Sequence, residues 1–284
     1  MKILFTKMHV LNNEFIVING VKQAFTPNAR LIRQWADRHS GIGFDQLLLI
    51  EKPHDKQAHF YYRIFNANGN EVAQCGNGAL CVAQFLSNEK LSTENPIRLA
   101  TKTSFIELQL GKNHEVIANL GAPIFSPEKI PFISASEKII YPLDTPFGRF
   151  DCCVLSLGNP HCILQVDDLE NTSVKELGAY LNQSPHTYFP QGINVEFITI
   201  KNPKHIGVRV YERDVGETQA CGSGACAAVI AGRILNRLKK NVKVQLPGGQ
   251  LNVHWQGLGS PVLLIGKGET IFQGEIEIKT LTDS

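Results

Sequence analysis

The sequence lacks the marks of several large protein classes. Lys and Arg exceed Asp and Glu by only two among 284 residues, 28 against 26, and the only basic run, Arg237–Lys240, reads as the solvated end of a helix. No apolar segment is long enough to span a bilayer, and residues 1–10 contain neither a signal-peptide core nor a cleavage site. These absences predict a soluble, cytoplasmic protein that binds neither nucleic acid nor a membrane.

No Cys-x-x-Cys pair is present among the seven cysteines. Cys152 and Cys153 are adjacent, and the pairs Cys75/Cys81 and Cys221/Cys226 are spaced too widely for a structural zinc knuckle. An odd cysteine count in a long chain of cytosolic type indicates thiols rather than a disulfide framework. The sequence therefore predicts no metal site, with zinc as the competing interpretation.

What the chain does contain is a motif present twice, Cys75-Gly76-Asn77-Gly78 and Cys221-Gly222-Ser223-Gly224. The offset of 146 positions that aligns the motifs also aligns other residues, namely Asn13 with Asn159, Arg63 with Arg209, Phe65 with Tyr211, Glu71 with Glu217, and Ala79 with Ala225. One offset shared by separate blocks indicates duplication, and hence two related halves.

The hydrophobic pattern predicts the same elements in each half. Helices are expected over residues 29–38, 78–88 and 225–238, each of the last two directly after a cysteine motif. Strands are expected over 3–7, 14–18, 46–50, 59–66, 147–154, 162–166, 195–200, 207–211, 242–245 and 250–255. The fold class is thus mixed α/β (α+β), with a curved, mainly antiparallel sheet around one long helix in each half. A segment rich in proline and serine, 121–146, predicts a junction between halves 1–120 and 121–266.

A thiol at a helix N-terminus meets the positive end of the helix dipole, which is expected to lower its pKa and make it a usable base. Gly-x-Gly after each cysteine frees backbone N–H groups for an anion such as an α-carboxylate. If the halves pack about a pseudo-twofold axis, Cys75 and Cys221 approach one cleft from opposite sides, which suits inversion of a carbon next to a carboxylate without pyridoxal phosphate. The remaining cysteines, in helix or strand interiors, are expected to be inert.

Several polar residues follow or precede strands, where site residues commonly lie. His161 and Glu212 could shift the pKa of a cysteine thiol. The alternatives are that His161 is structural, as a single His usually is, and that Glu212 forms a surface ion pair with Arg213. Asn13, Asn66, Asn159 and Asn194 fall in or beside loops, where an Asx turn is the alternative.

Taken together, these residues resemble the diaminopimelate epimerase family over nearly the whole chain. The most specific pieces are Asn66-Ala-Asn-Gly with Cys75-Gly-Asn-Gly, then Gly158-Asn-Pro-His161, and Tyr211-Glu-Arg213 leading to Ala220-Cys-Gly-Ser-Gly-Ala225. The resemblance implies two pseudo-symmetric halves, each with a barrel-like sheet around a helix, and an active site in the cleft between them. It also implies a C-terminal segment, 267–284, that returns to the first half, a homodimer, and no cofactor.

By the same resemblance, Cys75 and Cys221 form the thiolate and thiol pair, assisted by His161 and Glu212. The reacting carboxylate is expected on the backbone of Gly76, Asn77, Gly222 and Ser223. The distal amino acid end of the substrate would be held by a set of polar side chains, Asn66, Asn159, Asn194, Glu212 and Arg213, with Asn13 and Gln46 lining the site. This set offers a cation for a carboxylate and acceptors for an ammonium.

The chain departs from the family pattern at several positions. The first loop reads Met8-His-Val10-Leu-Asn12-Asn-Glu-Phe15, with Val10 and Asn12 where glycines are usual. Asn12 tolerates a positive φ but Val10 resists it. Asn70 replaces Ser, Leu80 replaces Arg, and Gly266-Lys-Gly268 replaces Gly-Pro-Ala.

The sequence thus predicts an epimerase that interconverts LL- and meso-diaminopimelate, an amino acid substrate of lysine and peptidoglycan precursor synthesis. Because the first loop has changed, a racemase of another amino acid on the same fold, such as histidine, is the alternative. A non-catalytic redox or metal-binding thiol protein is the alternative from a different class.

Overall fold

The computed structural model describes residues 2–183 and 187–278. The fold is mixed α+β, dominated by sheet, as the sequence predicts. The chain divides by its internal contacts into two units, with junctions at 118/119 and 266/267. Unit 1 takes its described residues from Met1–Ala118 and Lys267–Ser284, and unit 2 is Asn119–Gly266. Residues 279–284 of the expected returning segment lie outside the described residues. No helix within the described ranges is long and apolar enough to cross a membrane.

Unit 1 is built on a curved sheet in the order β18, β1, β2, β3, β4, β6, β7, with β5 beside β4. Neighbours are antiparallel except β2–β3 and β4–β6, which are parallel. The strands are β1 (Lys2–Val10), β2 (Asn13–Asn19), β3 (Gln46–Glu51), β4 (Phe60–Asn66), β5 (Glu71–Val72), β6 (Ile97–Ala100), β7 (Phe105–Leu110) and β18 (Glu269–Glu277).

Unit 2 repeats this arrangement in the order β9, β10, β11, β12, β13, β15, β16, β17, with β14 beside β13. Its parallel pairs are β11–β12 and β13–β15, at the equivalent positions. The strands are β9 (Tyr141–Thr145), β10 (Gly148–Ser156), β11 (Pro160–Gln165), β12 (Asn194–Asn202), β13 (His205–Glu212), β14 (Gly216–Thr218), β15 (Asn241–Leu246), β16 (Gly249–Trp255) and β17 (Val262–Gly266), and β8 (Val116–Asn119) leads into this unit. Among the described residues, the strands that begin and end this order, β9 and β17, do not pair with each other, so this sheet is not closed into a barrel.

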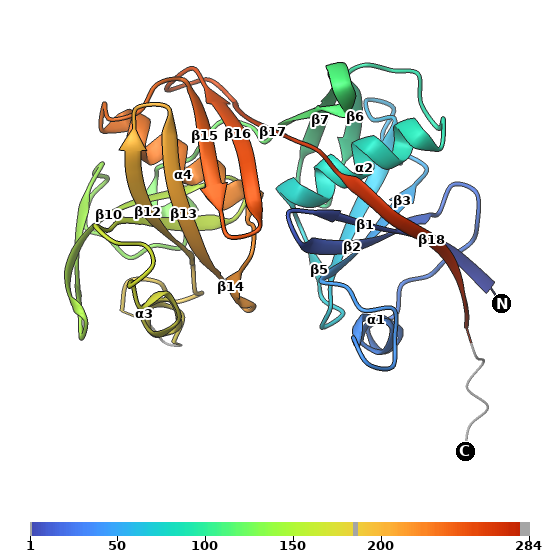
Figure 1. Cartoon of the computed structure of the whole chain (residues 1–284), viewed down its shortest axis with the longest axis horizontal. Coiled ribbons are helices and arrows are strands. Elements are labelled where there is room, and N and C mark those ends of the chain that lie inside the picture. Colours follow the sequence, from blue (N-terminus) through green and yellow to red (C-terminus); the bar gives the residue numbers. More distant parts are fainter. Residues whose placement is uncertain (1, 184–186, 279–284) are drawn as a thin grey trace. The chain divides into compact units, whose positions relative to one another are not determined.

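Each unit packs its sheet against one buried helix, α2 (Gly76–Asn88) or α4 (Gly222–Ile234), as Figure 1 shows. Both helices are apolar on nearly all faces, as buried helices are. The expected end of α4 at residue 238 is wrong, because the helix ends four residues earlier and Asn236 adopts a positive φ of 58°. Arg237–Lys240 therefore lies in the connection to β15 rather than on a helix end.

Two shorter helices lie in the crossovers of the parallel pairs β2–β3 and β11–β12, whereas α2 and α4 lie in those of β4–β6 and β13–β15. Helix α1 (Ala29–Ala36) begins at Asn28, whose side chain caps the first turn, and ends two residues before the expected Arg38. Helix α3 (Val174–Leu181) was not predicted from the sequence. Two single 3-10 turns, η1 (Lys112–His114) and η2 (Pro127–Lys129), are the other helical segments in the described part of the chain.

The duplication extends to side-chain pairs. Arg63 forms a bidentate ion pair with Glu71, at 2.8 and 2.9 Å. At the same offset of 146, Arg209 donates to Glu217 at 2.7 Å. Each pair joins the long central strand to the short strand that precedes the cysteine motif. The segment before the cysteine is therefore held by an equivalent ion pair in both units.

The structure shows where several residues that depart from the family pattern lie in unit 1. The first loop is a two-residue hairpin turn in which Leu11 and Asn12 have positive φ values of 50° and 66°. Val10 stays in β1, opposite Asn13. Leu80 is fully buried on α2. A Cβ at Gly268 would lie 2.7 Å from Cys81 Cα, so only glycine lets the returning segment approach this helix so closely.

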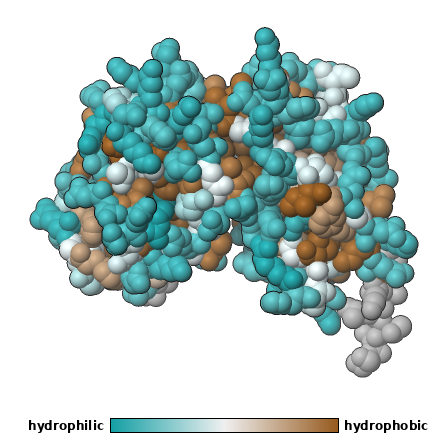
Figure 2. Space-filling view, viewed as in Figure 1, coloured by the Kyte–Doolittle hydropathy of each residue, from teal (hydrophilic) through white to brown (hydrophobic). Residues whose placement is uncertain are grey.

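The surface of unit 1 carries exposed apolar side chains. Figure 2 shows apolar atoms over the region of β1 and β18, two strands that expose Leu4, Ile271 and Phe272. The homodimer expected from the resemblance stays a prediction.

Candidate active site

Each cysteine motif forms the N-terminus of a buried helix, as the sequence predicts. Cys75 is the N-cap of α2, with extended backbone (φ −148°, ψ 112°), and its sulfur accepts from the N–H of Gly78 at 3.2 Å. Cys221 is the N-cap of α4, with φ −126° and ψ 112°, and its sulfur lies 3.6 Å from Ser223 Oγ. Gly76 and Asn77, or Gly222 and Ser223, form the first helical turn after each sulfur.

An asparagine at the start of a neighbouring strand holds each first turn. Asn77 Nδ2 donates to Asn13 Oδ1 at 3.2 Å, and Asn159 Nδ2 donates to Ser223 Oγ at 3.2 Å. Both pairs obey the offset of 146 positions. The duplication has therefore preserved a link between this asparagine and the helix, and in both halves it places an amide beside the Gly-x-Gly turn.

The other predicted substrate-binding residues of unit 1 lie at the ends of adjacent strands. Gln46 begins β3 and Asn66 ends β4, where Gln46 Nε2 donates to Asn66 Oδ1 at 2.8 Å. Asp45 accepts from Asn13 Nδ2 at 2.9 Å and is itself paired with Arg38 at 2.9 Å. Asp45 thus orients the amide of Asn13 so that its oxygen faces Asn77.

The other predicted substrate-binding residues of unit 2 lie at the corresponding strand ends. Asn194, at the start of β12, donates to the carbonyl of Pro160 at 3.0 Å and accepts from the N–H of Arg213 at 2.9 Å. Glu212 ends β13, where Thr218 Oγ1 donates to its carboxylate at 2.6 Å. The guanidinium of Arg213 is about one-third exposed and donates to the carbonyl of Gln191 at 3.3 Å.

His161 is completely buried, and both of its ring nitrogens are engaged. Nδ1 lies 2.7 Å from Glu196 Oε1, and Nε2 lies 3.0 Å from Asn159 Oδ1. Through Asn159, the imidazole is connected to the first turn of α4. Its placement makes it a support for Asn159 and Ser223.

The expectation that the helix end lowers the pKa of both thiols is wrong for Cys221. Burial raises the pKa of this thiol well above its ordinary value, and the nearby carboxylates Glu212 and Glu196 raise it further. A side chain only 5% exposed loses the solvation of a thiolate, and these effects outweigh the hydrogen bonds from Ser223 and the Gly224 N–H, which lower the pKa. Burial likewise raises the pKa of Glu212, against the hydrogen bonds from Thr218 and Cys221 that favour its carboxylate. Cys221 is therefore a thiol at neutral pH, suited to donating a proton.

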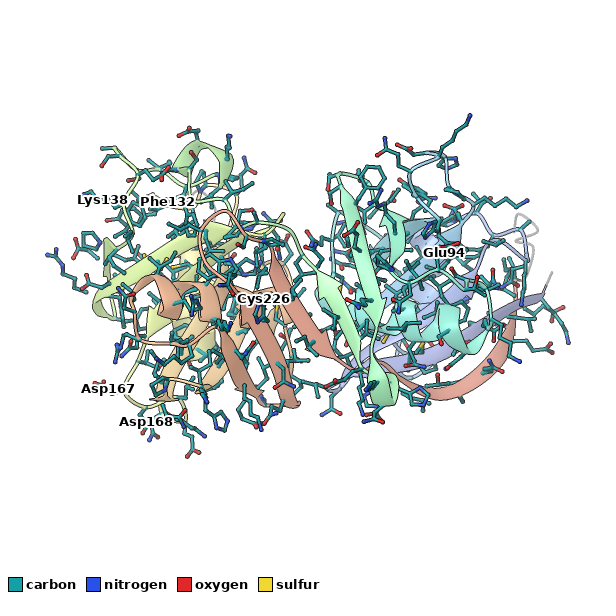
Figure 3. The ribbon with its side chains drawn as sticks, turned by 90° about the horizontal axis from the view of Figure 1, so that it is seen from above. Glu94, Phe132, Lys138, Asp167, Asp168 and Cys226 are labelled. Carbon is teal, nitrogen blue, oxygen red and sulfur yellow. The ribbon has the colours of Figure 1, made fainter. Side chains whose placement is uncertain are left out.

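Five cysteines lie away from these turns and are buried, namely Cys81, Cys152, Cys153, Cys162 and Cys226. Burial raises the pKa of Cys153 to about 12 and also raises that of Cys226, which Figure 3 shows on its helix inside unit 2. Buried thiols that lie in strand or helix interiors, away from both Gly-x-Gly turns, are expected to behave as small apolar side chains. Over the described part of the chain, no group of three or more His, Cys, Asp or Glu side chains is arranged to hold a metal ion.

Three residues of this region were missed from the sequence. Asp45 directly precedes the expected strand residue Gln46, and Tyr62 lies inside β4. Glu196 is a charged residue within the otherwise apolar run 195–198. That interruption was a usable signal, because a carboxylate in a buried strand needs a partner.

Gly78 and Tyr62 provide a test of how tightly α2 approaches the sheet. A Cβ on Gly78 would lie 2.4 Å from Tyr62 Oη, a buried hydroxyl without a hydrogen-bond partner among the described residues. Gly78→Ala is expected to destabilise the protein by about 1–3 kcal/mol through overpacking. Tyr62→Phe removes an unsatisfied hydroxyl, so it is expected to be neutral or stabilising by about 1 kcal/mol.

Urea unfolding of the two single variants and the double variant measures this coupling. The double variant is expected to recover part of the loss, since the hydroxyl is the nearest obstacle. Equal destabilisation of Gly78→Ala with and without the hydroxyl would contradict the close contact.

The chain is similar to known proteins over most of its length. A sequence model of the family described as diaminopimelate epimerase matches residues 5–126 and 153–271. Among solved structures, a hydroxyproline epimerase from Agrobacterium vitis, with bound trans-4-hydroxy-L-proline, is 16% identical with a TM-score of 0.71, covering 97% of this chain and 92% of that one. A probable proline racemase from Agrobacterium radiobacter K84 is 15% identical with a TM-score of 0.72, covering 99% and 94%.

A phenazine biosynthesis protein of the PhzF family from Bacillus anthracis is 13% identical with a TM-score of 0.67, covering 98% of this chain and 100% of that one. At these identities the solved structures establish a shared fold.

Proposed function

The chain belongs to the diaminopimelate epimerase family, whose fold is that of epimerase- and racemase-type isomerases, and we propose that it interconverts LL- and meso-diaminopimelate. The observation that carries this proposal is the pair of equivalent half-sites. Each has a cysteine as N-cap, a Gly-x-Gly first turn and an asparagine fixed beside it. A symmetric pair of acid–base groups is what inversion at a carbon atom requires.

In the proposed reaction, the Cys75 thiolate removes the α-hydrogen from one face of the substrate. The electron pair of the broken C–H bond moves into the α-carboxylate as an enediolate, and the thiol of Cys221 then gives its proton to the opposite face. The reverse reaction exchanges the two roles. The buried, neutral state of Cys221 supports its assignment as the acid in the first direction.

The first turns of α2 and α4 supply the groups that stabilise the intermediate. Helix N-termini present unpaired N–H groups and the positive end of a dipole, so the backbone from Gly76 and Gly222 onward suits the α-carboxylate. Charge that develops on its oxygens is better stabilised by such fixed donors than by water. This arrangement invokes no cofactor.

The distal amino acid end of diaminopimelate is assigned to the polar strand ends. The guanidinium of Arg213 suits the distal carboxylate, because its planar fork matches a carboxylate in two parallel hydrogen bonds. The distal ammonium is assigned to acceptor oxygens. These are the carboxylate of Glu212 and the side-chain amide oxygens of Asn66, Asn159 and Asn194. Asn13 and Gln46 complete the lining, and His161 acts through Asn159.

A panel of amino acids tests the substrate. Purified protein is incubated with LL-diaminopimelate, L-proline, trans-4-hydroxy-L-proline or L-histidine, and the epimers are separated by chiral chromatography. Conversion of diaminopimelate alone is expected. The two proline substrates matter because solved structures of similar fold carry those names. Turnover of proline or histidine without turnover of diaminopimelate would contradict the proposal and indicate a racemase of that amino acid instead.

A further inference from the structure

Glu196 is a buried carboxylate that none of the proposed chemical steps uses. Its side chain is completely inaccessible to solvent, and Oε1 lies 2.7 Å from His161 Nδ1. Oε2 has no hydrogen-bond partner among the described residues. The side chain also reaches the start of α4, because a Cβ on Gly224 would lie 2.8 Å from its Oε1 and 3.3 Å from Cys221 Sγ. Its ionisable neighbours are His161, Cys221, Glu212 and Cys162.

The hydrogen-bond directions fix where the protons of this group lie. Asn159 Nδ2 donates to Ser223, so Asn159 Oδ1 is the atom that faces the imidazole. An amide oxygen only accepts, and His161 Nε2 must therefore carry a hydrogen. Nδ1 then shares a second proton with Glu196 Oε1, either as an imidazolium beside a carboxylate or as a neutral imidazole beside a carboxylic acid. In both forms the pair is neutral overall, which its complete burial favours.

Unit 1 lacks this pair at the equivalent place. In the parallel pairing of unit 2, His161 is opposite Asn194, and in unit 1 Phe15 is opposite Gln46. Phe15 thus corresponds to His161, and Leu48, two residues after Gln46, corresponds to Glu196. Phe15 and Leu48 are both fully buried and apolar. There the equivalent asparagine is oriented instead by an acceptor, Asp45.

The equivalent asparagines of the two halves are therefore held with opposite orientations of their side-chain amides. Asp45 receives a hydrogen bond from Asn13, so the Asn13 oxygen faces α2. His161 gives a hydrogen bond to Asn159, so the Asn159 amide nitrogen faces α4. Because the apolar pair in unit 1 fills the same place, packing alone does not require the ionisable pair of unit 2.

We propose that Glu196 is a positioning residue: it shares one proton with His161 and thereby fixes the imidazole that orients Asn159 and Ser223 beside Cys221. Gly224 is required for this arrangement, since any side chain there would displace the carboxylate. The catalytic consequence rests on the proposed epimerase function, whereas the proton arrangement does not.

Nitrogen-15 NMR of the histidine side chains tests the proton arrangement in the whole protein without substrate. The His161 signals are assigned as those lost in His161→Phe. We expect Nε2 to carry a slowly exchanging hydrogen, which Glu196→Gln retains because its amide can donate to Nδ1. Glu196→Leu is expected to speed that exchange. An unprotonated Nε2 in the wild type, or an exchange rate unchanged by Glu196→Leu, would overturn the proposal.

Epimerase kinetics with matched variants separate positioning from stability. Glu196→Leu is expected to lower kcat by about 100-fold, the scale of a misplaced acid–base group, while Glu196→Gln stays close to wild type. The double variant Glu196→Leu/His161→Phe copies the apolar pair of unit 1, so it is expected to regain the melting temperature but not kcat. Recovery of both would reduce Glu196 to a packing role and overturn the proposal. Glu176→Gln, an exposed carboxylate change on α3 of the same unit, is the control.

Discussion

Replacing either Cys75 or Cys221 by alanine is expected to lower the rate of diaminopimelate epimerisation by about 10⁴-fold, the upper range for loss of a general acid or base. Each substitution removes the group that serves one face of the α-carbon and leaves the opposite thiol in place. The measurement is the initial rate of epimer formation, normalised to folded protein.

The single-cysteine variants also separate the two half-reactions. In heavy water, each variant is expected to exchange the α-hydrogen of only the epimer that presents it to the remaining sulfur, with little inversion. Cys226→Ala, a buried cysteine one turn along α4, is the control and is expected to keep its kcat. Full epimerase activity in either Cys75→Ala or Cys221→Ala would contradict the two-base mechanism.

Arg213→Gln is expected to lower kcat/KM for diaminopimelate by about 100-fold or more, because the bound substrate would cover the guanidinium, and loss of one partner from a covered charge pair costs several kcal/mol. Arg213→Lys should recover only part of the loss, since an ammonium cannot make the two parallel hydrogen bonds of a guanidinium. The loss should appear mainly in KM, because the distal carboxylate is remote from the reacting carbon.

The matched control is Arg149→Gln, which removes a largely exposed arginine from the same unit. It should leave kcat/KM unchanged, because its nearest carboxylate, Asp144, is 3.9 Å away and also exposed. Equal losses in Arg149→Gln and Arg213→Gln would indicate a general charge effect and contradict a specific contact with the substrate.

The family and the fold class could be predicted from the sequence because the duplication leaves two independent copies of each signal. The glycine motif, the preceding Arg–Glu pair and the asparagine before it recur at one offset, and the structure pairs the equivalent residues in each copy. Helix α3 and the short strands β5 and β14 escaped prediction because their periodic patterns are brief, and the longer strands β6 to β9, β17 and β18 were also not predicted. The end of α4 was misplaced because Leu235 and Leu238 continue the apolar spacing beyond the turn at Asn236.

The electrostatics of the site were harder to predict than its location. The helix dipole is a local property of the motif and can be inferred from sequence, whereas the burial of Cys221 and its proximity to Glu196 depend on how β12 packs against α4. The same holds for His161, whose partners come from Asn159 and from a strand 35 residues away. The equivalent motifs in the two halves consequently have different surroundings, with Tyr62 near Gly78 and Glu196 near Gly224.

The most direct test of the proposed epimerisation is the isotopic content of the product from LL-diaminopimelate in heavy water. Early in the reaction, before the product reacts again, each molecule of meso-diaminopimelate is expected to carry one deuterium at the inverted carbon, while the remaining LL-substrate stays largely unlabelled. This pattern follows from removal of hydrogen by one sulfur and delivery of a solvent-equilibrated hydrogen by the other. Absence of the meso product, or a meso product that retains the original hydrogen at the inverted carbon, would contradict it.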